Sequence, residues 1–352
     1  MSLRPLALAV VSLFLLQAAW TPPAVASTGQ ATSGASAEKV RKVAVKKASG
    51  KKVERKTSGK KRVSKRATAN KVALKREPAP VLRAADVPLA LDADGLPQLR
   101  SSAFVVANAQ TGNVIIERKG DEVVPIASIT KLMTAMVVLD AGLDLSEEIT
   151  VSSDDIDTLK GTGSRLPLGT RLTREEMLHL ALMSSENRAA SALARHYPGG
   201  EAAFVAAMNV KARLIGLVDT QFSDSTGLNP ENVSSPRDLV RMVAAASTFP
   251  LIREFSTSPE RHVKIGSRVH RFGNTNALVR SAEWDIAVQK TGYIREAGRC
   301  LVMQAKLLDQ PVVIVLMDSD GRYSRTADAV RVKKWLETAG AQRLAALAPR
   351  KG

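Results

Sequence analysis

Apolar positions predominate in two short runs near residue 100. Residues 103–109 and 113–118 are rich in β-branched and aliphatic side chains, and Gln110-Thr111-Gly112 separates them. Such a pattern, bounded by a glycine-containing turn, is typical of a β-hairpin. Three further strand-like runs lie near the C-terminus: 284–290, 300–308 and 311–317. We therefore expect strands at both ends of one folded region.

The chain between these strands has helical composition. Predicted helices cover 126–139, 173–183, 188–197, 201–214 and 236–247, and a last one covers 324–338. Thr173, followed three residues later by Glu176, has the spacing of a capping box and marks a helix start. Strands, then helices, then strands with one helix predict an α+β fold, in which an antiparallel sheet combines N- and C-terminal strands.

The first 26 residues have the pattern of a signal peptide. Arg4 precedes an apolar run from 6 to 19, and Ala24-Val25-Ala26 forms a small-x-small cleavage pattern. This run is shorter than the ~20 residues that span a bilayer as a helix. We therefore expect an exported, periplasmic protein, with an uncleaved anchor as the alternative.

Residues 27–90 differ in composition from the rest. Between 38 and 77 there are 17 Lys and Arg, three Glu and no aromatic residue, a charge of +14 out of the chain's +17. So few large apolar side chains cannot offset the entropy of ordering, and we expect a disordered basic linker. If the protein is exported, the basic linker would meet anionic envelope polymers or lipids rather than nucleic acid. The alternative is that the linker is a plain solvated spacer.

Outside that segment the charge is nearly balanced, and we expect a catalytic domain at 91–340 and a C-terminal tail at 341–352. A single cysteine excludes a disulfide framework and a Cys-based zinc site. Paired metal-ligand histidines and glycine-rich phosphate loops are absent from the sequence, so no metal or cofactor is expected. Cys300 is expected to be buried and inert, and the scattered histidines are expected to be structural or at the surface: His179, His196, His262 and His270.

A serine and a lysine open the first predicted helix as Ser128-Ile129-Thr130-Lys131. Residues three apart share a helix face, so the amine can reach the hydroxyl. A neutral lysine can deprotonate a serine, and burial beside a second cation would keep it neutral. The motif alone is weak, because the basic segment contains chance matches such as Ser49 with Lys52.

Two further motifs strengthen this interpretation. Ser185-Glu186-Asn187 lies between two predicted helices, where a second hydroxyl and an amide could reach a peptide. Lys290-Thr291-Gly292 ends the predicted strand at 284–290 and supplies a second cation, a hydroxyl and a glycine that allows close backbone approach. The joint occurrence of the three motifs points to a serine–lysine acyl-transfer site.

The sequence around these motifs resembles the D-alanyl-D-alanine endopeptidases among the low-molecular-mass penicillin-binding proteins. The similar stretches are Pro-Ile-Ala-Ser-Ile-Thr-Lys-Leu-Met-Thr-Ala at 125–135, Met-Ser-Ser-Glu-Asn-Arg-Ala-Ala at 183–190 and Gln-Lys-Thr-Gly-Tyr at 289–293. The resemblance covers about 91–339 and implies the serine β-lactamase/DD-peptidase-like fold, a five-stranded antiparallel sheet flanked by helices with a helical subdomain. It does not extend to the basic segment.

The resemblance also implies roles for the motif residues. Ser128 would be the nucleophile, Lys131 its base and Ser185 the proton relay. Lys290, Thr291, Gly292 and Asn187 would bind substrate, and the backbone N–H groups of Ser128 and Tyr293 would form the oxyanion hole. Substrates would be peptidoglycan stem peptides and their crosslinks, and β-lactams would be covalent inhibitors.

Three alternatives remain at this point. The family's anchored carboxypeptidases carry a further β-rich domain and a terminal helix, and the 62 residues after Lys290 favour an endopeptidase over that carboxypeptidase alternative. A polyanion-binding envelope protein with an inactive domain would explain the basic segment but not the motifs. A serine β-lactamase would turn β-lactams over, and no glutamate motif of the class A kind is evident in the sequence.

Overall fold

The computed structural model describes residues 80–346 of the 352-residue chain. All of them belong to one compact unit. The predicted signal peptide, the basic segment up to residue 79 and the last residues of the C-terminal tail lie outside the described part, and their assignments stay predictions.

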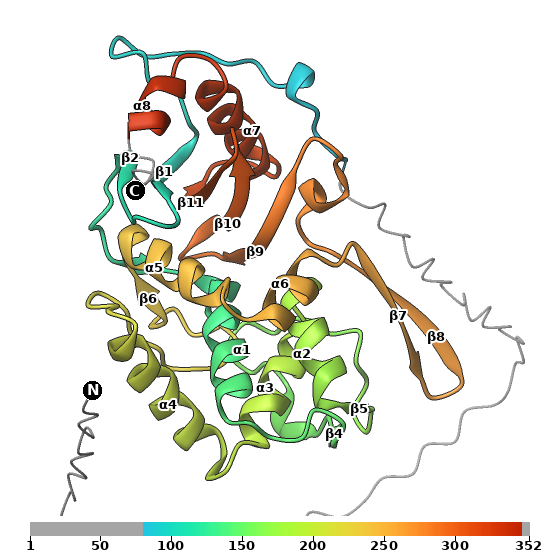
Figure 1. Cartoon of the computed structure of the whole chain (residues 1–352). Helices are drawn as coiled ribbons and strands as arrows, with labels where there is room; N and C mark the ends of the chain where they lie inside the picture. Colours follow the sequence, from blue (N-terminus) through green and yellow to red (C-terminus); the bar gives the residue numbers. More distant parts are fainter. Residues whose placement is uncertain (1–79, 347–352) are drawn as a thin grey trace, which may run out of the picture. The chain divides into compact units, whose positions relative to one another are not determined.

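A five-stranded antiparallel sheet is the centre of this unit (Figure 1). Its order is β2 (Val114–Arg118), β1 (Ser101–Asn108), β11 (Gln310–Ser319), β10 (Gly298–Leu307) and β9 (Asp285–Ile294). The sheet therefore joins the predicted N-terminal hairpin to the C-terminal strands, as expected. β9 is an edge strand, so one side of it has no strand partner in the described residues.

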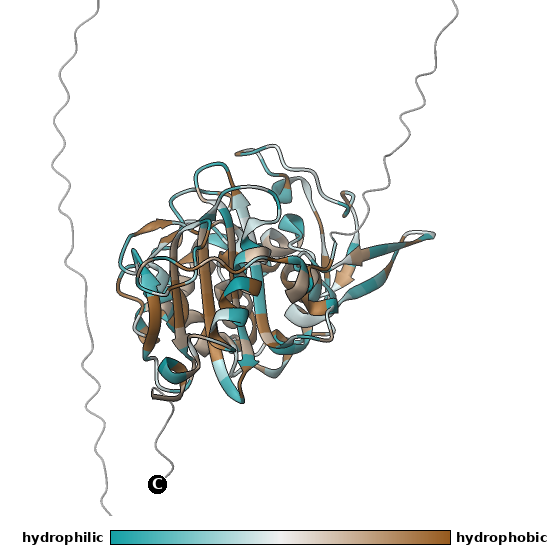
Figure 2. Cartoon of the chain, turned by 90° about the horizontal axis from the view of Figure 1, so that it is seen from above, coloured by the Kyte–Doolittle hydropathy of each residue, from teal (hydrophilic) through white to brown (hydrophobic). Residues whose placement is uncertain are grey.

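Both faces of the sheet are buried, which explains the nearly continuous apolar strands (Figure 2). Val105 and Val302 lie beside Val315 in register and belong to the larger core cluster, with residues of the central helices. The neighbouring positions face a second cluster that contains side chains of the closing helix, such as Trp335. The sheet thus separates two apolar layers.

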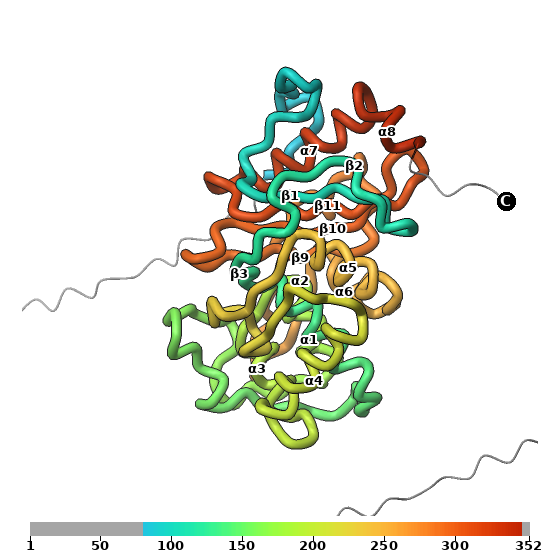
Figure 3. The backbone as a smooth tube through the Cα atoms, turned by 90° about the vertical axis from the view of Figure 1, so that its left-hand side faces the viewer, coloured from blue at the N-terminus to red at the C-terminus, as the bar shows by residue number. Residues whose placement is uncertain are grey.

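Helices cover both layers (Figure 3). Their bounds are α1 (Lys131–Asp140), α2 (Arg174–Met183), α3 (Asn187–Arg195), α4 (Gly200–Leu214), α5 (Pro236–Ala246), α6 (Pro250–Thr257), α7 (Ser324–Leu336) and α8 (Ala341–Ala346). The capping box predicted at the start of α2 is present, with Thr173 and Glu176 bonding reciprocally. α6 was not expected; it is a short helix that starts at a proline.

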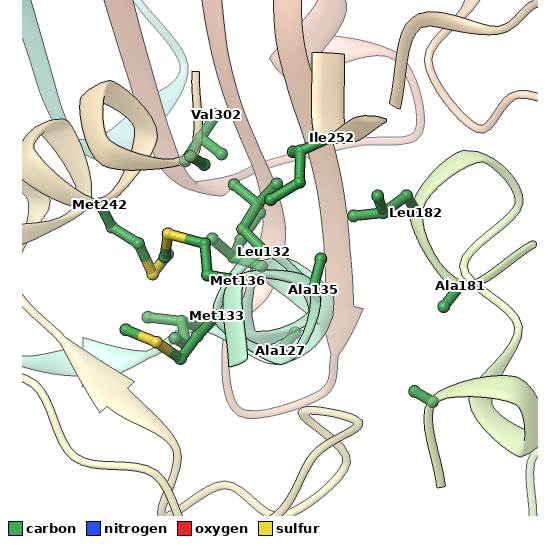
Figure 4. Close-up of a cluster of buried hydrophobic side chains, with 14 of the residues drawn as sticks. Ala127, Leu132, Met133, Ala135, Met136, Ala181, Leu182, Met242, Ile252 and Val302 are labelled. Atoms are coloured by element: carbon green, nitrogen blue, oxygen red, sulfur yellow. The ribbon is translucent and has the colours of Figure 1, made fainter. Parts of the chain in front are cut away.

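Helix α1 is buried from Lys131 to Val138 and mostly apolar, because it lies at the centre of the helical layer. Its side chains point outward in several directions, toward Met242 of α5, Ile252 of α6 and Val302 of β10 (Figure 4). A buried helix surrounded by other elements is a rigid support. The side chains in the first turn of α1 are therefore held firmly in place.

Short elements complete the unit. Two-residue β3 (Val124–Pro125) pairs with β6 (Val233–Ser234), and β4 (Glu148–Thr150) pairs with β5 (Arg171–Thr173). β7 (Glu260–Ile265) and β8 (Arg268–Gly273) form a hairpin that projects from the helices (Figure 1). Sequence analysis did not predict this hairpin, although Gly266-Ser267 between two alternating runs is a turn signal. The four 3₁₀ helices of the described chain are Ala84–Asp86, Ala127–Thr130, Ser153–Asp155 and Ala277–Arg280.

Two predicted boundaries need correction. Residues before 91 were assigned to the disordered linker, but Val87 is buried against α7, and Lys334 donates to the carbonyls of Ala84 and Val87. The ordered part therefore starts before residue 91. At the other end, 341–346 form α8 rather than a tail, because Leu344 is buried in the same apolar cluster.

No helix among residues 80–346 is long and apolar enough to span a bilayer.

Candidate active site

Ser128 and Lys131 lie where a 3₁₀ turn runs into α1. Ser128 is half-buried and Lys131 is fully buried. Lys131 Nζ lies 2.9 Å from Ser128 Oγ, 2.8 Å from Asn187 Oδ1 and 2.6 Å from the carbonyl oxygen of Thr226. The predicted serine–lysine pair is thus formed, and two more oxygen atoms surround the amine.

The partners of Lys131 determine where its lone pair points. A carbonyl oxygen can only accept, so Thr226 O and Asn187 Oδ1 each take one N–H of a neutral amine. The lone pair is then left facing the hydroxyl of Ser128. Neutral Lys131 is therefore oriented to accept the Ser128 proton.

The surroundings of Lys131 also favour the neutral form. Burial lowers its pKa to about 7, and the carboxylates of Asp224 and Glu186 oppose part of that shift. Near neutral pH a substantial fraction of the enzyme therefore carries an unprotonated amine.

Ser185 and Lys290 form a second hydroxyl–amine pair. Lys290 Nζ donates to Ser185 Oγ at 2.9 Å and to its neighbour's carbonyl, Thr291 O, at 3.0 Å. Lys290 is fully buried, and burial together with the positive charges of Lys131 and Arg325 holds its pKa well below the usual range. The second lysine expected near Lys131 is present.

The lysine motif lies inside β9, not at its end as expected. Register with β10 continues past it, with Thr291 opposite Leu301 and Tyr293 opposite Arg299. The polar Lys290 and the glycine at 292 interrupt the apolar pattern of the strand, so the pattern alone ended the strand at Lys290. Arg325 Nη1 donates to the Gly292 carbonyl at 2.7 Å and fastens α7 to this stretch.

Two glycines allow β9 and a loop to approach Ser128. A Cβ on Gly292 would lie 3.2 Å from the Ser128 nitrogen, so β9 runs directly beside the backbone of Ser128. A Cβ on Gly227 would lie 1.9 Å from the Ala127 carbonyl oxygen. Ala127, next to Ser128, has a φ of 48°, and Ser185 has a φ of 60°. Backbone strain is therefore present at both serine motifs.

Substituting Gly227 with alanine should disturb fold and site together. The new methyl group would overlap the Ala127 carbonyl, and φ at Gly227 is +80°, so we expect a loss of about 2–4 kcal/mol of stability. Urea denaturation measures this loss. Gly112→Ala is the matched control, since it also has positive φ but nothing within 4 Å. Equal losses in both variants would contradict the close-approach argument.

The sequence is similar to known peptidases over most of the described part. A family model described as D-alanyl-D-alanine carboxypeptidase matches residues 91–321. The chain belongs to this family. Curated relatives include the D-alanyl-D-alanine endopeptidases of Pseudomonas aeruginosa and Escherichia coli, which are 46% and 45% identical. The matched regions cover 69% of this chain and 80% and 79% of those two proteins.

Solved structures agree with this membership. The crystal structure of a Streptomyces DD-transpeptidase has a TM-score of 0.63 and 27% identity, covering 68% of this chain and 97% of that one. A D-alanyl-D-alanine carboxypeptidase from Mycobacterium tuberculosis has a TM-score of 0.63 and 25% identity, covering 75% and 95%. The predicted family resemblance and the predicted fold are both confirmed.

In this D-alanyl-D-alanine peptidase family member, a loop that sequence reasoning missed completes the site. Asp224 accepts hydrogen bonds from Gly227 N and Asn232 Nδ2, both at 2.7 Å, and this folds the loop so that the Thr226 carbonyl faces Lys131. Asn232 Nδ2 also donates to Thr130 Oγ1, two residues after Ser128, at 3.0 Å. A backbone carbonyl has no signature of its own in a sequence, so motif spacing could not find it.

Histidine and cysteine lie outside this peptidase site. His179 stacks on Phe255 with ring centroids 4.4 Å apart, and burial lowers its pKa to about 4. Cys300 is fully buried, and burial raises the pKa of its thiol to about 11. Both are structural, as expected. Within residues 80–346 no cluster of His, Cys, Asp and Glu could hold a metal ion.

Proposed function

We propose that this chain is an exported serine DD-peptidase that hydrolyses D-alanyl crosslinks in peptidoglycan through an acyl-enzyme on Ser128. One observation carries the proposal: the buried amine of Lys131, with its pKa near 7, has its lone pair facing the Ser128 hydroxyl. The two relatives at 45–46% identity are named endopeptidases, which supports that specificity over carboxypeptidase.

In the acylation step, Lys131 takes the Ser128 proton as Oγ attacks the D-alanine carbonyl carbon. The oxyanion that forms would be held by the backbone N–H groups of Ser128 and Tyr293. The proton passes through Ser185 to the departing amine as the C–N bond breaks, and Lys290 holds Ser185 in place. Water then attacks the ester, and the Ser128 hydroxyl is regenerated.

Substrate binding in this proposal uses the remaining motif residues. Asn187 Oδ1 is occupied by Lys131, so its Nδ2 donates to the substrate's amide carbonyl. The hydroxyl of Thr291 bonds the far end of the bound peptide, or the carboxylate of a β-lactam; within the protein it meets Thr275 Oγ1 at 2.7 Å. The basic segment would hold the exported enzyme near anionic envelope polymers.

Product analysis on crosslinked muropeptides tests the specificity. We expect purified enzyme to convert dimers into monomers whose stem peptides are intact, because the bond cleaved is the crosslink itself. Mass spectrometry of the products measures this. The family description makes D-alanyl-D-alanine carboxypeptidase the second candidate, and release of free D-alanine from uncrosslinked stems, with dimers left intact, would establish it instead.

A further inference from the structure

Residues 157–165 form a loop that we name the strap. The carboxylate of Asp157 accepts the backbone N–H groups of Leu159 at 2.9 Å, Lys160 at 2.9 Å and Thr162 at 2.7 Å. These bonds fold the strap around one side chain, so that it can move as a unit. Gly161 inside it has a positive φ of 62°.

One end of the strap is fastened to the helical wall of the site. Ser164 Oγ and Arg165 Nε donate to the two carboxylate oxygens of Glu186, at 2.7 and 2.8 Å. Glu186 is nearly fully buried and lies between Ser185 and Asn187 of the second motif. The base of the strap is thus anchored beside the proton relay.

The other end reaches the opposite wall. Lys160 Nζ pairs with Glu296 Oε1 at 2.5 Å, and Glu296 lies in the turn that follows β9. The two side chains are 25% and 40% exposed, so the pair is weak and can open at low cost. The strap therefore connects the helical wall to the β9 wall of the same site.

The strap also contacts Asn187, whose side-chain amide is proposed to bind the substrate carbonyl. Asn187 Nδ2 donates to Thr162 Oγ1 at 3.0 Å, while Asn187 Oδ1 is held by Lys131. Asn187 Nδ2 carries two N–H donors; Thr162 takes one of them, and a substrate carbonyl can accept the other only directly beside the strap. Asn187 and strap residues Asp157 and Leu159 line one cavity of about 200 Å³.

The strap also has a contact next to β9, along which a peptide can bind. β9 is an edge strand, and an extended peptide acylating Ser128 can add to its free edge, a common mode of peptide recognition. Such a peptide, running past Tyr293 in the strand direction, meets the turn at Glu296 where Lys160 is bound.

We propose that the strap is a latch on the acyl side of the cleft, closed by the Lys160–Glu296 pair, which a peptide substrate must open to run along β9 past Asn187. This inference rests on the proposed function. It makes Lys160 and Glu296 determinants of the acylation rate although neither contacts the reacting atoms.

Acylation kinetics test the latch. Lys160→Ala and Glu296→Gln should each raise the second-order rate of labelling by fluorescent penicillin by about two- to fivefold, the range that a partly exposed ion pair permits. Lys160→Glu combined with Glu296→Lys should restore the wild-type rate. Lys306→Ala, which removes an exposed pair with Asp309 away from the site, is the matched control and should change nothing.

Salt gives an independent measurement. Raising ionic strength screens the exposed pair, so the wild-type rate should rise toward that of Lys160→Ala while the variant's rate stays flat. Unchanged or slower labelling of the Lys160 and Glu296 variants would overturn the latch. If unmodified, folded enzyme is not labelled at all, the proposed function itself fails, and the two results are distinguishable.

Discussion

Replacing Ser128 with alanine is expected to abolish covalent labelling by penicillin and to lower hydrolysis of D-alanyl peptides by about 10⁴-fold or more. Among residues 80–346, only Ser128 combines a hydroxyl at 2.9 Å from the buried Lys131 amine with a position beside the backbone of Gly292. Without its oxygen atom no acyl-enzyme can form, and substrate binding alone leaves little catalysis.

Labelling followed by intact-protein mass spectrometry checks this expectation. Ser128 is half-buried and loses only a hydroxyl, so the variant should keep a cooperative unfolding transition. Ser102→Ala, which removes an exposed hydroxyl bonded to Asp318, is the matched control and should be labelled normally. Persistent labelling of folded Ser128→Ala would assign the nucleophile to another residue.

The acylation rate should depend steeply on pH through Lys131. Its pKa of about 7 lies far below that of a free lysine, and only the neutral amine can accept the Ser128 proton. Because protonation removes the base, the rate should fall about tenfold for each pH unit below 7 and level off above it, until other groups titrate. Substituting Lys131 with methionine should remove this dependence together with about 10³-fold or more of the rate.

Stopped-flow measurement of penicillin acylation between pH 5 and 9 gives the profile. Lys264→Met, an exposed position on the β7–β8 hairpin, is the matched control and should keep the wild-type curve. A rate that stays constant from pH 5 to 7 would show that Lys131 is not the base in this range.

Sequence alone was sufficient for the chemistry that depends on neighbouring residues. Ser128 and Lys131 are three apart on one helical face, and this spacing by itself predicted their meeting. The capping box at Thr173 and the hairpin at 103–118 were predicted for the same reason, since their partners are close in the chain. Each of these features is a local interaction.

The lysine motif interrupts the apolar pattern of β9, so the strand was ended at Lys290, although pairing with β10 continues through the motif. Contacts between residues far apart in the sequence could not be predicted from local patterns. Val87 was assigned to a linker because its anchor, α7, lies far along the chain. The strap's pair, Lys160 and Glu296, is separated by 136 residues and has no motif.

The sequence by itself determined the α+β domain and the groups proposed for the chemistry: a serine, two lysines, a second serine and an amide. The tertiary structure decided their protonation and orientation. A lysine becomes a base only when burial removes it from water, and its lone pair is directed only when carbonyls such as Thr226 O occupy its other positions. Burial and carbonyl placement arise from packing between distant segments, which no local pattern encodes.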